Sequence, residues 1–274
     1  MLKKVILIVL IIVSVGCNCK QTESLSFWKE PITGMEFVLI PKGSFIMGSH
    51  SINDNSNTEK PHKVTISEDF WLARTEVTQQ QWQIIMGVEE FHPEKPSPFR
   101  NTNPQYPIVS VSYFDIQKFL NILNKLSPES TFRLPTEAEW EYACRAGTTT
   151  PFSTGSHISD AQANFNSEFA SDYSTSGNYI GHPVPISSYP PNSWGLYDMH
   201  GNVWEWVADW YAPYSSEPVL DPQGPLVGKH KVIRGGSWYF GANNARSSTR
   251  RLHEPELWGF SIGFRIVCER IKAD

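Results

Sequence analysis

The feature that most restricts the fold is the way in which short apolar stretches alternate with turn-forming residues along almost the whole chain. The sequence of 274 residues contains 18 glycines and 20 prolines, and these interrupt the apolar stretches at close intervals. The sequence has no internal repeat and no low-complexity tract. Regular structure must therefore be modest, and we expect a single domain over residues 31–274.

Both strands and helices are predicted within that domain. Residues 35–49 predict two strands around a turn at 41–43, and further strands are expected at 62–66, 70–75, 232–234 and 264–267. Three helices are expected to start with capping boxes, at Thr78 with Gln81, at Ser112 with Asp115 and at Thr136 with Glu139. Short strands and helices in one domain, with a long irregular stretch from Thr148 to Pro191, indicate the α+β class.

The amino-terminus has the composition of a signal peptide. Lys3 and Lys4 precede an apolar run from Val5 to Val13, which is too short to span a bilayer as a helix of about 20 residues. Small residues and then Cys17 follow, and this order resembles a bacterial lipobox, although Ser14 stands where leucine is usual. An ordinary secretory signal is the alternative.

Processing at the lipobox would give a membrane-anchored protein. The resemblance implies a signal peptide over 1–16, a lipid on Cys17 and a tether over 17–30, and so a protein of the bacterial cell envelope, on the outer-membrane surface. Removal of Lys3 and Lys4 leaves 21 basic against 28 acidic residues, which lowers the formal net charge from −5 to −7. We therefore expect no nucleic-acid partner, because phosphate binding needs a concentrated basic surface.

Two cysteines remain in the folded part, Cys144 and Cys268, and no CxxC motif or Cys/His metal spacing is present. They could pair as a disulfide or stay as small buried thiols, and the sequence leaves both options open. Glu137, Glu139 and Glu141 alternate along a predicted helix, so they cannot share one face as a paired acid and base. GxSxG, P-loop and GxGxxG motifs are absent from the sequence.

Four phrases are specific enough to indicate a family. They are FRLPTEAEWEYACRAG at 132–147, NSWGLYDMHGNVWEWVADWY at 192–211, RGGSW at 234–238 and GFR at 263–265. In this order they resemble the formylglycine-generating-enzyme or sulfatase-modifying-factor family, and IPKGSFIMGS and RTEVTQQQW fit its amino-terminal half. The resemblance implies a C-type-lectin-like fold of the formylglycine-generating-enzyme type, with a small twisted sheet, flanking helices and a loop-rich face that carries the ligand.

The enzymes of that family bind copper(I) through two cysteines, three and eight positions after the serine of GGS, and oxidise a substrate cysteine. Counting from Ser237 gives Phe240 and Ala245. Neither side chain can be a thiolate, which is the ligand type that copper(I) prefers. We therefore expect the scaffold without copper and without a catalytic site. A formylglycine-generating-type oxidase, or another enzyme of the family, is the alternative.

Residues 238–265 resemble the variable region of a second family on this scaffold, the variable proteins of diversity-generating retroelements, of the Treponema variable protein type. In that family, error-prone copying changes asparagine codons at scattered positions while other positions stay fixed. The fixed positions match here at Trp238, Ala242 to Arg246, Arg250, Pro255 and Gly263 to Arg265. The resemblance implies a ligand-binding set at codons reachable from asparagine: Tyr239, Gly241, Thr249, Arg251, Leu252, His253, Leu257, Gly259, Phe260 and Ser261. Glu254 and Trp258 are not reachable in this way.

The composition of this set suits binding. Tyr239, His253, Leu257 and Phe260 offer rigid contact area, and Arg251 offers adaptable hydrogen bonds. We therefore expect a monomeric lipoprotein that binds a protein or glycan ligand at this site. Ordinary loop residues on a purely structural envelope lipoprotein are the alternative.

The turn from Asp198 to Glu205 resembles the family's calcium loop. The resemblance assigns the ion a side-chain oxygen of Asp198, the carbonyls of Gly201 and Val203, and the Glu205 carboxylate, a mixture that suits calcium. A second family site begins at Asn164 and the Phe165 carbonyl, but its later ligands have no clear counterpart. One structural calcium ion is therefore expected, with a loop held by hydrogen bonds alone as the alternative.

Overall fold

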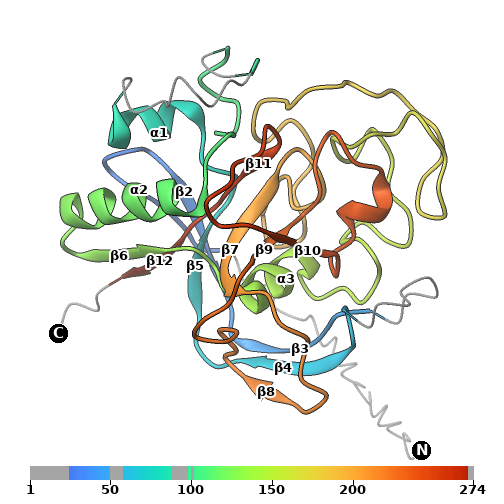
Figure 1. The fold of residues 1–274 in the computed structure, drawn as a ribbon, viewed down its shortest axis with the longest axis horizontal. Coiled ribbons are helices and arrows are strands. Elements are labelled where there is room, and N and C mark those ends of the chain that lie inside the picture. The colour runs from blue at the N-terminus through green and yellow to red at the C-terminus, as the bar shows by residue number, and fades with distance from the viewer. Residues whose placement is uncertain (1–24, 50–57, 88–97, 100–101, 271–274) are drawn as a thin grey trace, which may run out of the picture.

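The computed structural model describes residues 25–49, 58–87, 98–99 and 102–270 (Figure 1). The predicted signal peptide, Cys17 and most of the tether lie outside these residues. Within them, regular structure consists of three small sheets, three α-helices and one 3₁₀ turn, η1 (Ala242–Ala245). The α+β class is therefore confirmed. None of the described helices is long and apolar enough to cross a membrane.

The largest sheet has five strands, and all its neighbouring pairs are antiparallel. Their order is β1 (Phe27–Lys29), β2 (Glu36–Ile40), β5 (Phe70–Ala73), β12 (Val267–Arg270) and β6 (Ser130–Arg133). Successive side chains point to opposite faces of a strand. Phe37 and Phe132 accordingly belong to one core cluster, and Val38 and Leu72 belong to another.

Two smaller sheets complete the β structure. One has the order β10 (Arg250–His253), β9 (Lys231–Arg234), β7 (Trp204–Trp210) and β11 (Ile262–Gly263). The other has the order β3 (Gly43–Met47), β4 (His62–Ile66) and β8 (Val219–Leu220). The strand predicted at 264–267 is misplaced, because residues 264–266 connect β11 to β12 and only Val267 lies in a strand.

The three helices are α1 (Gln79–Met86), α2 (Tyr113–Leu126) and α3 (Glu137–Arg145). Each starts where the sequence predicts it, with a capping box in which the hydroxyl of Thr78, Ser112 or Thr136 accepts a backbone N–H three residues on. Every residue of α3 is buried. Its three glutamates must therefore find charged or polar partners inside the protein.

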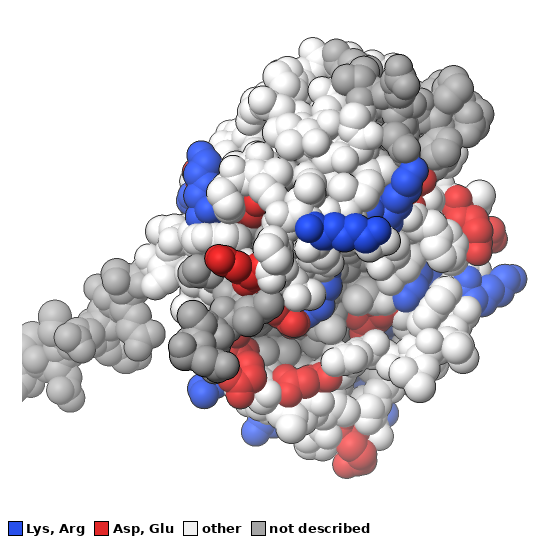
Figure 2. All heavy atoms as spheres, turned by 90° about the vertical axis from the view of Figure 1, so that its left-hand side faces the viewer, with Lys and Arg blue, Asp and Glu red and all other residues white. Residues whose placement is uncertain are grey.

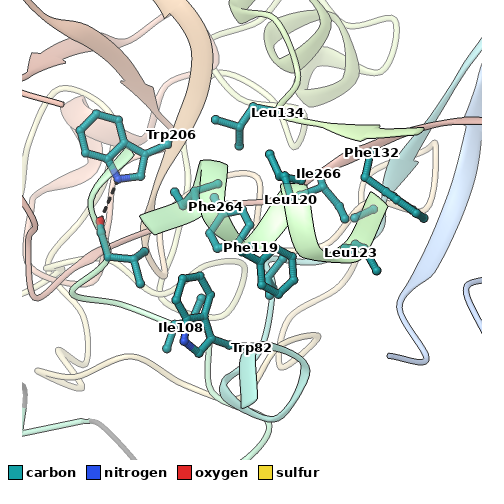
Figure 3. Close-up of a cluster of buried hydrophobic side chains, with 14 of the residues drawn as sticks. Trp82, Ile108, Phe119, Leu120, Leu123, Phe132, Leu134, Trp206, Phe264 and Ile266 are labelled. Atoms are coloured by element: carbon teal, nitrogen blue, oxygen red, sulfur yellow. Dashed lines mark hydrogen bonds between the residues drawn. The ribbon is translucent and has the colours of Figure 1, made fainter. Parts of the chain in front are cut away.

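An aromatic stack joins α1 and α2 to the chain between β11 and β12 (Figure 3). The rings of Trp82 and Phe119 lie parallel with centroids 5.3 Å apart, and Phe264 packs edge-on against both. In the same cluster, Trp206 Nε1 donates a hydrogen bond of 3.1 Å to the Val111 carbonyl. This packing fixes the frame around the carboxy-terminal part of the chain.

Residues 146–203 contain no helix or ladder strand, only isolated bridges, so the predicted irregular stretch is confirmed. These residues fill the upper right of Figure 1 and lie beside the segment that carries η1. Asn166 N donates to the Phe240 carbonyl at 3.0 Å, and Ser247 N donates to the Pro151 carbonyl at 2.7 Å. The irregular stretch thus supports residues 238–265 from one side.

Candidate functional site

Helix α3 presents two glutamates to two arginines of the carboxy-terminal segment. Arg250 donates from Nε and Nη2 to the Glu137 carboxylate at 2.8 and 2.6 Å. Arg234 pairs with Glu141 and lies 3.5 Å from Glu137. All four side chains are buried. Each arginine therefore needs its glutamate, because water does not reach these buried groups to compensate the charge of an unpaired arginine.

Two further arginines fasten the same segment. Arg246 donates to both oxygens of Glu59 at 2.9 Å. Arg265 donates to both oxygens of Glu205 at 2.7 Å. Both pairs are buried, and two-point pairing fixes the orientation of the guanidinium group. The segment is thus attached to the scaffold by four arginines, at 234, 246, 250 and 265.

Exposure within residues 238–265 separates most of the predicted fixed positions from half of the predicted binding set. Most positions that the sequence assigns as fixed are buried: Trp238, Ala242, Ala245, Arg246, Arg250, Pro255, Gly263, Phe264 and Arg265. Asn243 is exposed and Asn244 is half-buried. Five members of the predicted binding set are exposed, and we call them the variable-segment surface: Tyr239, Arg251, Leu252, Leu257 and Phe260.

Aromatic contacts organise this surface. Tyr239 and Phe260 are 50% and 40% exposed, and their rings meet edge to face with centroids 5.2 Å apart. Both rings also contact the buried Trp238, at 5.4 and 5.7 Å. The Arg251 guanidinium lies 4.7 Å from the centre of the Phe240 ring. The result is a preorganised apolar patch beside a cation, a combination typical of binding hot spots.

Thr249 and Ser261 are not available for contact, contrary to the prediction. Both are buried. The Thr249 hydroxyl donates to the Asn243 carbonyl at 3.0 Å, and the Ser261 carbonyl accepts from Trp204 N at 2.8 Å. Both residues therefore belong to the buried scaffold and not to the ligand-facing surface. Three other predicted members are half-buried: Gly241, His253 and Gly259.

The two predicted cation loops lie against each other. Asn202 N donates to the Asn164 carbonyl at 2.7 Å. Gly201 has φ +95°, and a Cβ there would lie 2.3 Å from the same carbonyl oxygen, so only glycine fits this turn. Asp198 accepts from Ser187 N at 2.9 Å. The structure therefore brings Asp198, Gly201 and Asn164 into one region.

Sequence reasoning missed Glu76, which joins this region. Its Oε1 accepts from Asn202 Nδ2 at 3.1 Å, whereas its Oε2 is buried without a hydrogen-bond partner. Burial, together with the neighbouring Asp198 and Glu205, raises the pKa of Glu76 well above its usual value. Burial also raises the pKa of Asp198 to about 6. The only signal for Glu76 is its place in the phrase RTEVTQQQW.

The oxygen atoms around this loop are of the kind that bind a hard cation such as calcium. Glu76 Oε2 and Asn164 Oδ1 are buried oxygens without hydrogen-bond partners. Arg265 is the cation near the carboxyl groups of Glu76, Asp198 and Glu205, and of these three it pairs only with Glu205. Glu205 fits less well, because both its oxygens bond to Arg265 and one also accepts from Trp140 Nε1 at 2.8 Å. Among the residues that the structure describes, no three or more His, Cys, Asp or Glu side chains are grouped to hold a metal ion.

Comparison with known families decides the relationship. The model of the "Sulfatase-modifying factor enzyme 1-like domain" matches residues 24–270. The chain belongs to this family. A relative within the sulfatase-modifying family is the formylglycine-generating enzyme of Bos taurus, 30% identical over 198 residues, which are 69% of this chain and 51% of that protein. The chain thus spans about half the length of this curated relative.

Two solved structures have the same fold as this chain. Treponema denticola variable protein 1 matches with a TM-score of 0.71 and 25% identity, over 90% of this chain and 99% of that one. PvdO from Pseudomonas aeruginosa matches with a TM-score of 0.72 and 28% identity, over 89% and 98%. The predicted C-type-lectin-like fold of the formylglycine-generating-enzyme type is confirmed.

The positions of the family's copper-binding cysteines carry no thiol in this sulfatase-modifying domain. Phe240 lies half-buried beneath Arg251, and Ala245 is buried. Cys144 and Cys268 are both buried, and no disulfide joins them. Burial raises the pKa of the Cys144 thiol to about 12. That thiol is therefore protonated at neutral pH, whereas metal binding requires a thiolate.

Proposed function

We propose that this protein is a lipid-anchored envelope protein that binds a protein or glycan ligand through the variable-segment surface. The observation that carries the proposal is the division of residues 238–265. Most of the fixed positions are buried, and the arginines at 246, 250 and 265 are ion-paired, whereas five positions of the predicted binding set face solvent. The exposed side chains can then change without loss of stability, because the buried residues provide most of the free energy of folding. The likeness to Treponema denticola variable protein 1 supports this function.

The chemistry of the surface suits a ligand with both apolar and acidic or hydroxyl groups. Tyr239, Leu257 and Phe260 supply large rigid side chains. Arg251 contacts the rings of Phe240 and Trp204, and no described carboxylate pairs with it. Its guanidinium donors are therefore open to a ligand acceptor.

A ligand screen tests the proposal. The full chain is screened against a glycan array and against surface proteins of candidate hosts. We expect the triple variant Tyr239→Ser, Arg251→Ser, Phe260→Ser to lose at least about a hundredfold in affinity for any ligand found, since hot-spot side chains each contribute about 2 kcal/mol or more. Phe114→Ser, a similarly exposed aromatic on α2, is the control. Equal binding by the triple variant would favour the structural envelope protein.

Diversification of the segment belongs to the same proposal, and neighbouring DNA tests it. We expect a near-copy of codons 238–265 that differs at template adenines, beside a reverse-transcriptase gene. The lipid anchor is tested separately. Labelled fatty acid should enter the protein in cells and fail to enter the Cys17→Ser variant.

The alternative function is an oxidase of the sulfatase-modifying family, to which the formylglycine-generating enzymes belong. Phe240 and Ala245 oppose it, because the chain offers copper(I) no thiolate pair at these positions. We expect no oxidation of a cysteine-bearing peptide by the purified protein supplied with copper and oxygen. Formation of formylglycine in that assay would establish the alternative.

We also propose one structural calcium ion at the Asp198 loop. Asp198, Glu76 and the carbonyls of Gly201 and Val203 would hold it, with Glu205 reached only if Arg265 shares its carboxylate. Bound calcium would supply positive charge to a buried group of acids. Asn164 and the Phe165 carbonyl are the less complete second site.

A further inference from the structure

A second face of the molecule carries an open cleft of about 2140 Å³. Figure 2 shows this face hollowed across its middle, with acidic and basic side chains along the hollow. Residues of α2, of β6 and of the loop at 221–226 contribute to its lining. Small-molecule pockets measure about 300–1,000 Å³, so this cleft suits an extended chain. The variable-segment surface contributes no residue to its lining.

The floor of the cleft is a partly covered face of the five-stranded sheet. Leu39 pairs with Trp71, Trp71 with Cys268, and Cys268 with Phe132, so these side chains form one row across the sheet. Helix α2 covers the Phe132 end, where the Asn124 amide bonds to both backbone groups of Phe132 at 2.6 and 2.9 Å. Leu39 and Trp71 at the other end are only half-buried.

Acidic side chains dominate the charge of the cleft. Its lining contains seven Asp or Glu and three Lys or Arg. Two of the bases are already engaged: Arg133 pairs with Glu139 and Glu269, and Lys231 lies between the rings of Tyr113 and Trp210. Three of the acids are exposed and have no described basic side chain as an ion-pair partner: Glu68, Asp69 and Glu129. This charge attracts a basic ligand and repels nucleic acid and anionic lipid.

Two leucines of the lining are exposed. Leu126, at the end of α2, is 53% exposed, and Leu226 is 97% exposed. Exposed aliphatic side chains gain free energy when an apolar partner covers them. Aliphatic side chains of a peptide would supply that cover, whereas sugar hydroxyls would not.

We propose that this cleft binds an extended peptide segment of a partner protein that combines basic and apolar residues. Basic side chains would lie against Glu68, Asp69 and Glu129, and apolar ones against Trp71, Leu126 and Leu226. The site and its ligand are independent of the variable-segment surface. Failure at one site therefore leaves the other untouched.

The test uses the full chain and two fluorescein-labelled synthetic peptides, one of alternating lysine and leucine and one of alternating glutamate and leucine. We expect the lysine peptide to bind at least about tenfold more tightly by fluorescence anisotropy. Glu68→Lys with Glu129→Lys should weaken it about tenfold. Glu168→Lys with Glu256→Lys, the same charge change at exposed positions outside the lining, should leave its Kd unchanged.

A second pair of variants separates the cleft from its surroundings. Leu226→Ser should weaken the lysine peptide about tenfold, because a leucine contact is lost. Val227→Ser changes an exposed neighbour that does not line the cleft and should have no effect. Equal affinity for the two peptides, or unchanged affinity in both cleft variants, overturns the proposal. Binding of a neutral oligosaccharide that Leu226→Ser abolishes would assign the cleft to a glycan and overturn it too.

Discussion

Arg250 and Glu137 are joined by two hydrogen bonds of 2.8 and 2.6 Å, although 113 positions separate them in the sequence. The next residue, Arg251, points to solvent and lies over the Phe240 ring. Two adjacent arginines thus have opposite roles, because successive side chains of β10 face opposite ways. One attaches the segment to α3, and the other is offered to a ligand.

This contrast gives a matched pair of variants. Arg250→Met should lower the free energy of unfolding by about 3–5 kcal/mol, because it leaves the buried Glu137 charge without its closest partner. Arg251→Met should change it by less than about 0.5 kcal/mol, as expected for an exposed position. Urea unfolding of the two variants and the parent measures both values. Equal stability of the two variants would contradict the assignment of Arg250 to the frame.

The corrected positions of Thr249 and Ser261 make a second prediction. Substitution of either by leucine should destabilise the protein by about 1–3 kcal/mol, because each site is already packed. Tyr239→Ser and Phe260→Ser should each cost less than about 1 kcal/mol, since these side chains lie at the surface and are 50% and 40% exposed. Thermal unfolding of the four single variants compares the groups. If both leucine variants are as stable as the parent, Thr249 and Ser261 are not tightly packed, and both belong to the binding set after all.

Asp209 predicts a dependence of stability on pH. It is buried, and it accepts a hydrogen bond of 2.8 Å from Glu137 N. Burial and the Glu137 charge raise its pKa from 3.8 to about 7. Between about pH 4 and 7 the folded state holds a proton that the unfolded state has released, so Asp209's contribution to stability falls as pH rises.

The variant Asp209→Asn should remove that slope. At pH 8 it should be more stable than the parent by on the order of 4 kcal/mol, because no charge is then buried at this position. At pH 4 the two proteins should differ little. Denaturant unfolding between pH 4 and 8 provides the comparison, and parallel curves across this range would refute the role given to Asp209.

The calcium proposal predicts a response to chelation. Calcium at 1 mM should raise the Tm of the full chain by several degrees over EDTA, because the ion binds the folded state alone. Asp198→Asn should lose most of this gain, and Ser44→Ala, an exposed position on β3 that bonds to Thr65 and not to the loop, should keep it. Because the pKa of Asp198 is about 6, the gain should shrink below that pH, where protons compete. If the Tm is the same in calcium and in EDTA, the alternative holds, in which hydrogen bonds alone maintain the loop.

Local signals predicted the helices well, because a capping box acts over four residues and needs no distant partner. They failed at β7, which the sequence analysis did not identify as a strand. Trp204 to Val207 are all buried, so this strand lacks the apolar and polar alternation that marks a half-exposed one.

The site was predicted less completely, for two physical reasons. Codons reachable from asparagine identify positions that can vary, but they do not show which side chains reach solvent. Thr249 and Ser261 satisfy the codon rule and are nevertheless buried by tertiary packing. Glu76 lies far from Asp198 and Glu205 in the sequence, and only the tertiary fold brings it near enough for their charges to affect it. The glutamates of α3 behaved as expected of residues that cannot share one face: Glu137 and Glu141 bind the segment arginines, whereas Glu139 binds Arg133.

The register of β10 on β9, with Arg250 opposite Arg234, limits how this segment can evolve. A one-residue slip of β10 against β9, which an insertion or deletion just before Arg250 would allow, reverses the direction of every side chain along β10. Arg250 would then turn to water, and an outer residue would enter the acidic interior. Related copies of this gene should therefore differ in the amino acids that they encode between residues 238 and 265 but agree in the number of residues.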